Sequence, residues 1–156
     1  MKSIFRKIAC LSLAALVALG ALTGCGKNGY VSKLNEVTEA CNPIVDEFNT
    51  ALQNFESEEG AGQIGDILDR LQTEYKKILE IKAPKGYEDC TEKFQEAADK
   101  LDAGIALYKE ALATPISDEM TAEERKAYTE KISQGDDLFK EYQTAYQEGI
   151  NLVNSK

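Results

Sequence analysis

Residues 121–155, TAEERKAYTEKISQGDDLFKEYQTAYQEGINLVNS, carry the clearest structural pattern in the chain. Apolar residues and glycines recur there at alternating steps of four and three, which places them on one face of an α-helix. This face consists of Tyr128, Ile132, Gly135, Phe139, Tyr142, Tyr146, Gly149 and Val153. Thr121 and Glu124 have the spacing of a capping box, in which each side chain accepts a hydrogen bond from the other residue's backbone N–H. The stretch predicts one long amphipathic helix that begins after Thr121.

Three segments closer to the N-terminus repeat this period, and the chain from Tyr30 onward has almost no strand signals. Pro84-Lys85-Gly86 and Thr114-Pro115 are strong helix breakers, and residues 57–62 have the glycines and polar residues of a loop. The apolar face of the first predicted helix consists of Leu34, Val37, Cys41, Ile44, Phe48, Leu52 and Phe55. That of the second consists of Ile64, Ile67, Leu68, Leu71, Tyr75, Ile78 and Leu79. That of the third consists of Tyr87, Cys90, Phe94, Ala97, Leu101, Ile105, Tyr108 and Leu112.

Four amphipathic helices joined by short connections pack antiparallel with their neighbours, because a short loop cannot span the length of a helix. The sequence therefore predicts an all-α fold, an antiparallel up-down-up-down four-helix bundle. The alternative is a three-helix bundle with one helix loosely docked. Counting residues along the helices places Gly135 and Gly149 opposite Phe48 and Leu34, and we expect the glycines to make room for these side chains.

Pro43 falls inside the predicted first helix, where it removes one backbone hydrogen bond. Either the helix continues through Pro43 with a kink, or Asn42 caps a fresh helix that begins there. The apolar face keeps its phase across Pro43, which favours the kinked continuous helix.

The N-terminal residues have the order of a secretory signal. Lys2, Arg6 and Lys7 give a basic start, and residues 8–22 are almost wholly apolar but too short for a membrane-spanning helix. The apolar run ends in Leu22-Thr23-Gly24-Cys25. An uncleaved membrane anchor, or an ordinary secretory signal that ends at a chance cysteine, are the alternatives to a processed lipoprotein signal.

Leu22-Thr23-Gly24-Cys25 resembles the lipobox of bacterial lipoproteins. The resemblance implies that the Cys25 thiol carries diacylglycerol, that the signal is cut between Gly24 and Cys25, and that the new N-terminus is often acylated as well. Residues 1–24 would then be the lipoprotein signal peptide, residues 25–29 the lipidated cysteine and a short linker, and residues 30–156 the helical bundle domain. The whole chain is similar in architecture to small uncharacterised helical lipoproteins of Gram-positive bacteria, a likeness that supplies no binding residues.

The charge balance excludes several classes of function. The chain has 156 residues, with 18 Lys+Arg against 27 Asp+Glu and no histidine. We expect no nucleic-acid partner, because phosphate binding needs clustered basic residues. The absence of histidine excludes histidine-based triads, histidine general bases and histidine metal ligands. Acidic residues crowd the two loops expected at the end of the bundle far from the membrane, either as a tip facing away from anionic lipid or as a solvated surface.

Four cysteines are present, of which Cys10 leaves with the signal and Cys25 is the expected lipid site. Cys41 and Cys90 both lie on core-facing stripes, at heights that the residue count places within about one helical turn. Export past the membrane permits oxidation, so we consider a Cys41–Cys90 disulfide. The first and third helices of such a bundle are diagonal, however, and Cα atoms more than about 7 Å apart cannot be bridged. Two buried free thiols are the alternative.

The sequence offers no catalytic constellation. Cys41 and Cys90 have no histidine partner, and carboxylate pairs such as Asp136-Asp137 are expected on solvated helix faces. No metal site is predicted, although the acidic loops have oxygen ligands that could hold Ca²⁺ or Mg²⁺ weakly. The tyrosines fall at core spacing, where they pack as core or, alternatively, line a ligand cavity.

These observations favour a non-enzymatic lipoprotein without a cofactor, anchored by lipid to the extracytoplasmic face of the cell membrane. We expect it to act by protein–protein contact with an envelope protein, through its exposed tip or a helix face. The alternative is a lipoprotein that binds or carries a small ligand or a divalent cation.

Overall fold

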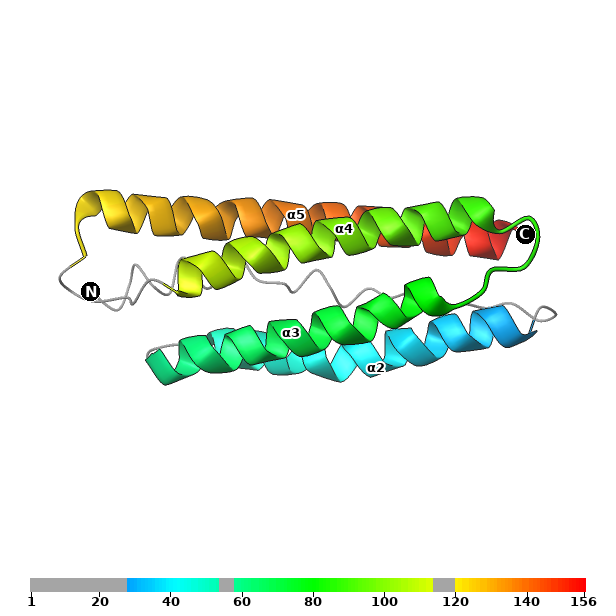
Figure 1. Ribbon diagram of the computed structural model, residues 1–156, viewed down its shortest axis with the longest axis horizontal. Helices are drawn as coiled ribbons and strands as arrows, with labels where there is room; N and C mark the ends of the chain where they lie inside the picture. Colours follow the sequence, from blue (N-terminus) through cyan, green and yellow to red (C-terminus); the bar gives the residue numbers. More distant parts are fainter. Residues whose placement is uncertain (1–27, 54–57, 114–119) are drawn as a thin grey trace.

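The computed structural model describes residues 28–53, 58–113 and 120–156, and these residues form an antiparallel four-helix bundle. The helices are α2 (Asn28–Gln53), α3 (Glu58–Glu80), α4 (Glu88–Leu112) and α5 (Ala122–Ser155). Successive helices reverse direction, and the start of α2, the α3–α4 connection and the C-terminus lie at one end (Figure 1). We call this the near end and the opposite one the far end. The predicted all-α, up-down-up-down bundle is confirmed.

The observed helix boundaries differ from the predicted ones mainly at α3. The expected loop over residues 57–62 is wrong for residues 58–62, because α3 already begins at Glu58. Glycine weakens a helix by about 1 kcal/mol but does not forbid it, so Gly60 and Gly62 can be accommodated in the first turns. Phe55, the lipobox and residues 114–119 lie outside the described residues.

Pro43 lies inside α2, which is one continuous helix from Asn28 to Gln53. The alternative of a fresh helix capped by Asn42 is therefore wrong. Pro43 is exposed, whereas its neighbours Cys41 and Ile44 are buried, so the apolar face does pass through it in phase. At the start of α5 the capping box is confirmed: Thr121 accepts a hydrogen bond from the Glu124 backbone, and Glu124 accepts one from the Thr121 backbone.

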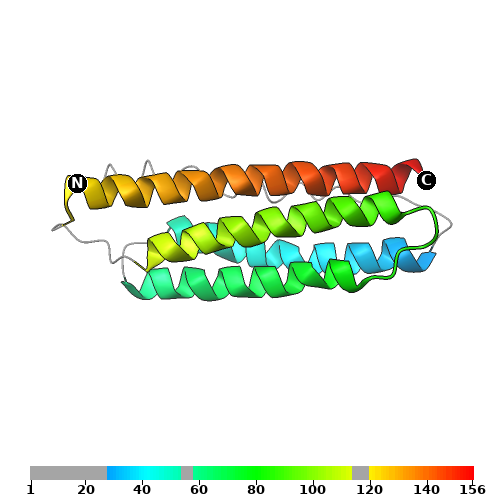
Figure 2. The same ribbon diagram turned by 45° about the horizontal axis from the view of Figure 1, so that its top comes forward.

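The core runs the length of the bundle between two layers, α2 with α3 and α4 with α5 (Figures 1 and 2). Its largest fully buried side chains include Phe48 of α2, Tyr75 of α3 and Phe94 of α4. Aromatic rings of the two layers pack edge-to-face against each other, as Tyr75 of α3 does against Tyr142 of α5. This arrangement is a favourable geometry for pairs of aromatic rings. Among the described helices, none is both long and apolar enough to cross a bilayer.

The closest pairing of helices in the bundle is that of α4 with α5. Three buried glycines allow it, each facing an aromatic ring of the other helix. A Cβ on Gly104 would lie 2.7 Å from the Phe139 ring, one on Gly135 would lie 2.6 Å from the Tyr108 ring, and one on Gly149 would lie 2.7 Å from the Phe94 ring. Gly135 and Gly149 thus make room, as expected, but for rings of α4. Their predicted partners on α2, Phe48 and Leu34, are wrong.

Candidate functional site

The predicted lipidation site, Cys25, lies outside the described residues, as do Gly24 and the predicted signal peptide. Helix α2 begins at Asn28, so only Gly26 and Lys27 separate Cys25 from the first helical residue. A chain of this length reaches about 10 Å when fully extended. Any lipid on Cys25 would therefore be tied to the near end of the bundle.

Cys41 and Cys90 are free, buried thiols in the structure, and the hypothesis of a disulfide between them is wrong for this conformation. The two helices that carry them run in the same direction, and their near ends are fixed relative to each other by Tyr30 and Tyr87, whose rings pack 5.4 Å apart. Cys41 lies three turns beyond Tyr30, whereas Cys90 lies one turn beyond Tyr87. The two cysteines therefore differ in height by about 12 Å, too far for a bridge.

Burial also makes both thiols poor nucleophiles. It raises the pKa of Cys41 to about 12, with the Glu74 carboxylate adding to the effect. It raises the pKa of Cys90 to about 11, and the neighbouring Asp89 raises it further by repulsion and by accepting a hydrogen bond from the thiol. Thiolate is the reactive form of cysteine, so both side chains behave as small apolar core residues.

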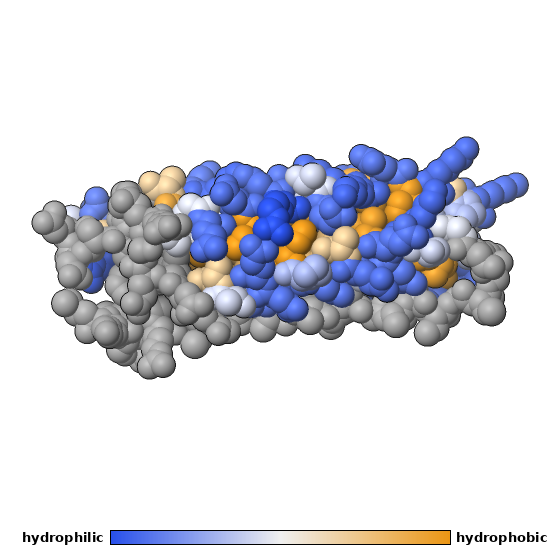
Figure 3. All heavy atoms as spheres, turned by 90° about the horizontal axis from the view of Figure 1, so that it is seen from below, coloured by the Kyte–Doolittle hydropathy of each residue, from blue (hydrophilic) through white to orange (hydrophobic). Residues whose placement is uncertain are grey.

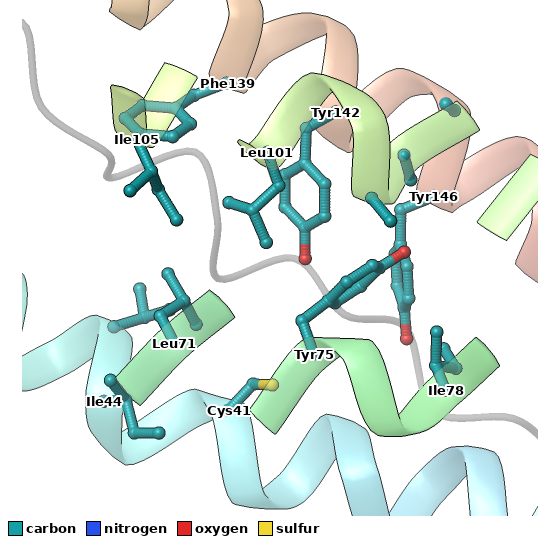
Figure 4. Close-up of a cluster of buried hydrophobic side chains, with 14 of the residues drawn as sticks. Cys41, Ile44, Leu71, Tyr75, Ile78, Leu101, Ile105, Phe139, Tyr142 and Tyr146 are labelled. Carbon is teal, nitrogen blue, oxygen red and sulfur yellow. The ribbon is translucent and has the colours of Figure 1, made fainter. Parts of the chain in front are cut away.

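The tyrosines of the bundle's middle section form a packed aromatic cluster. Tyr75 of α3 packs edge-to-face against Tyr142 of α5, with ring centroids 5.1 Å apart, and against Tyr146 at 6.0 Å. Cys41 points its sulfur toward Tyr75 in this cluster (Figure 4). Burial raises the pKa of Tyr75 and of Tyr142 well above 10, so both hydroxyls stay protonated. These rings fill space against one another, as the core interpretation predicts.

The hydroxyl of Tyr146 connects two helices that are far apart in the sequence. It lies 2.6 Å from the Thr38 hydroxyl of α2, and both side chains are buried. Burial raises the pKa of Tyr146 to about 12, although the bond to Thr38 opposes the shift. A buried hydroxyl without a partner would cost about 1–3 kcal/mol, so this bond satisfies both groups while joining α2 to α5.

Asp136 is a buried carboxylate that the sequence pattern missed. We expected it on a solvated face with Asp137, but its exposed fraction is only 7%. Tyr108 of α4 donates a short hydrogen bond to its Oδ1. Burial raises the pKa of Asp136, while the bond from Tyr108 and the nearby Lys140 oppose the shift. The pair is a buried polar link between α4 and α5, and the neighbouring acid, Asp137, is exposed and pairs with Lys140.

A shallow surface depression of about 630 Å³ follows the outward face of α4. Half of its lining residues are acidic, namely Glu88, Glu92, Glu96 and Asp99. Within residues 28–53, 58–113 and 120–156, however, no group of three or more acidic or cysteine side chains is arranged to hold a metal ion.

No known protein family, curated protein or solved structure matches this chain. Its function must be argued from its own residues.

The near end differs from the rest of the surface in its lysines. Along the helices, lysines pair with carboxylates of neighbouring turns or helices, as in Lys76–Asp102 at 2.7 Å and Lys109–Asp69 at 2.7 Å. In the described segments, three lysines form no ion pair. They are Lys33, Lys82 and Lys85, all exposed and all at the near end.

Proposed function

We propose that this chain is a lipid-anchored lipoprotein on the extracytoplasmic face of the cell membrane, whose helical bundle acts by protein–protein contact and not by catalysis. The observation that carries the proposal is the sequence Leu22-Thr23-Gly24-Cys25, followed within three residues by the first helix of the bundle. Two or more acyl chains at one cysteine give stable anchoring, where a single chain gives only marginal binding.

The non-catalytic part of the proposal is supported by the chemistry of the interior. The chain has no histidine to activate a nucleophile, and burial keeps the Cys41 and Cys90 thiols protonated. The tyrosines that could have lined a ligand cavity pack against one another instead. We therefore favour contact with an envelope protein over the small-ligand or cation carrier.

Replacing the lipidation cysteine tests the anchor. We expect Cys25→Ser to abolish incorporation of radiolabelled palmitate and to release the protein from the membrane fraction or leave it unprocessed. Cys10→Ser is the matched control, because this cysteine lies in the apolar run of the signal and should leave labelling and fractionation unchanged. Equal palmitate incorporation in wild type and Cys25→Ser would contradict the proposal.

Cross-linking in intact cells tests the contact. An amine-reactive cross-linker should join the wild-type protein to one envelope protein, because most lysines are exposed on the bundle surface. The adduct should be much weaker for Cys25→Ser, since the anchor confines both proteins to one surface. A wild-type chain that is labelled with palmitate but gives no adduct would reject protein contact while leaving the anchor intact.

A further inference from the structure

We propose that the near end of the bundle is a membrane-contact surface, in which Lys33, Lys82 and Lys85 bind the headgroups of anionic phospholipids. The inference rests on the proposed anchor at Cys25 and adds to it an orientation: the helices stand away from the bilayer, with the α3–α4 turn against the lipid.

Three free cations at one end are the first observation. Elsewhere on the described surface, lysines have their charge balanced by a carboxylate, including Lys93 with both Glu96 and Glu148. Lys33 lies in the second turn of α2, and Lys82 and Lys85 lie in the α3–α4 connection. Figure 3 shows hydrophilic side chains projecting from this end of the molecule. An anionic surface attracts each such lysine by about 1 kcal/mol.

Two of the acidic groups at the same end are engaged within the protein. The Asp89 carboxylate accepts a hydrogen bond from Lys156 at 2.9 Å, and Glu88 accepts one from the Gly86 backbone N–H at 2.9 Å. Glu80, in the last turn of α3, is exposed beside the turn, and Glu92 and Glu36, which accepts a hydrogen bond from Ser32, are also exposed at this end. The near end thus offers three lysines without an ion pair, beside two carboxylates that are engaged within the protein, on a chain whose net charge is −9.

The third observation is the short connection to the anchor. Gly26 and Lys27 allow a reach of only about 10 Å between Cys25 and α2, comparable to the distance over which surface charges act in physiological salt. Tyr30 packs edge-to-face on Tyr87 at 5.4 Å, so the start of α2 and the end of the α3–α4 connection lie side by side. A lipid on Cys25 would therefore bring all three lysines to the headgroup layer together.

The partly buried apolar side chains of this surface are compatible with such a contact. Val31, Ile81 and Ala83 pack against the core and retain some exposure. Gly86 has a φ of +92°, which lets the chain turn sharply here and keeps the connection close to the helix ends. Lys82 and Lys85 of this connection are both exposed.

The test uses the purified lipidated protein, reconstituted on vesicles of phosphatidylcholine alone or of phosphatidylcholine mixed with phosphatidylglycerol. A membrane-impermeant amine-acylating reagent is added, and the modification rate of each lysine is read by mass spectrometry. We expect Lys33, Lys82 and Lys85 to react about fivefold more slowly on the anionic vesicles, the ratio that corresponds to about 1 kcal/mol. High salt should remove the difference. Lys126, exposed in the first turns of α5, should react equally on both.

A charge variant gives the second arm. Lys156, which pairs with Asp89 at the same end, should also be protected on anionic vesicles in the wild-type protein. In K33Q/K82Q/K85Q this protection of Lys156 should be lost, while the matched variant K126Q/K131Q/K140Q should retain it. Equal reaction rates on the two vesicle types would overturn the inference, and so would protection that persists in high salt. Protection that grows with the protein-to-lipid ratio would indicate contact between copies and also overturn it. The mass of the Cys25 peptide decides the anchor separately, since a missing lipid would reject the proposed function itself.

Discussion

Asp136 is the one acidic side chain that is buried in the described part of the bundle. Its pKa is raised by burial in the folded protein above the ordinary aspartate pKa of about 4, so at pH values between the two the folded state binds more of this proton than the unfolded chain does. Folding stability must then fall as the pH rises from below 4 through the raised pKa of Asp136. The donor Tyr108 limits this loss by stabilising the carboxylate.

Asp136→Asn tests this coupling at the residue scale. The amide keeps an acceptor for Tyr108 but does not titrate. The unfolding free energy of the variant should therefore fall less than that of the wild type as the pH rises from below 4. Urea unfolding across the acidic range measures it. Asp137→Asn is the matched control, because Asp137 is exposed and pairs with Lys140 on the surface. An unchanged pH profile in Asp136→Asn would show that the carboxylate is not desolvated in solution.

The burial of Asp136 also shows what the heptad pattern can and cannot predict. The pattern identifies Gly135 and Phe139 as core residues, because they recur at steps of three and four. It does not say how far burial extends to either side of that face. Asp136 is buried because Gly135 lets the Tyr108 ring of α4 come close to α5, which brings the hydroxyl within reach of the carboxylate. That approach depends on a contact between helices, which no single-helix pattern contains.

At the scale of the elements, the α4–α5 pair depends on glycines that face aromatic rings. Residue counting along each helix predicted that Gly135 and Gly149 make room, but it gives only the height of a residue in the bundle. Which neighbouring helix faces the glycine depends on the rotation of each helix about its axis. The actual partners, Tyr108 and Phe94, therefore come from α4 and not from α2. The capping box at Thr121 was predictable because it is wholly local.

Gly104→Ala measures the tightness of this pairing. A Cβ at Gly104 would lie 2.7 Å from the Phe139 ring and 3.3 Å from the backbone oxygen of Gly135, which cannot move aside freely. We expect a loss of about 1–3 kcal/mol in unfolding free energy. Gly65→Ala in α3 is the control, because nothing lies within 4 Å of a Cβ there. It should stabilise the helix by about 0.5–1 kcal/mol. Destabilisation by both variants alike would contradict a packing cause, and denaturant unfolding compares them.

At the scale of the whole molecule, the accessibility of the two described thiols measures whether the bundle is folded. Cys41 is buried in the middle section, and Cys90 is buried near the near end. The sequence pattern correctly predicted both cysteines as core positions. The residue count gave the wrong difference in height between them, because it placed the reversal of the chain at the loop predicted over residues 57–62. The α3 helix begins at Glu58, several residues before the expected end of the loop, and this shifts the register of everything that follows.

We expect both thiols to resist an alkylating reagent in the native protein, because they are buried and their pKa values are raised to about 12 and about 11. In denaturant, without any reducing agent, both should react fully. Intact mass spectrometry counts the added groups, with Cys25 replaced by serine. A denatured, unreduced chain that takes up no reagent at Cys41 and Cys90 would mean that the two are oxidised in solution.

The unequal lengths of the helices have one more consequence. Helix α5 has 34 residues against 25 in α4, and it extends beyond its neighbours at the far end (Figure 2). Residues 121–127 are all exposed, so its first turns project as a single charged helix. With a rise of 1.5 Å per residue, α5 is about 50 Å long. If the chain is tethered to a membrane at its other end, the start of α5 would lie at a constant distance from the lipid. A receptor that binds this part of α5 would then do so at that one distance from the membrane.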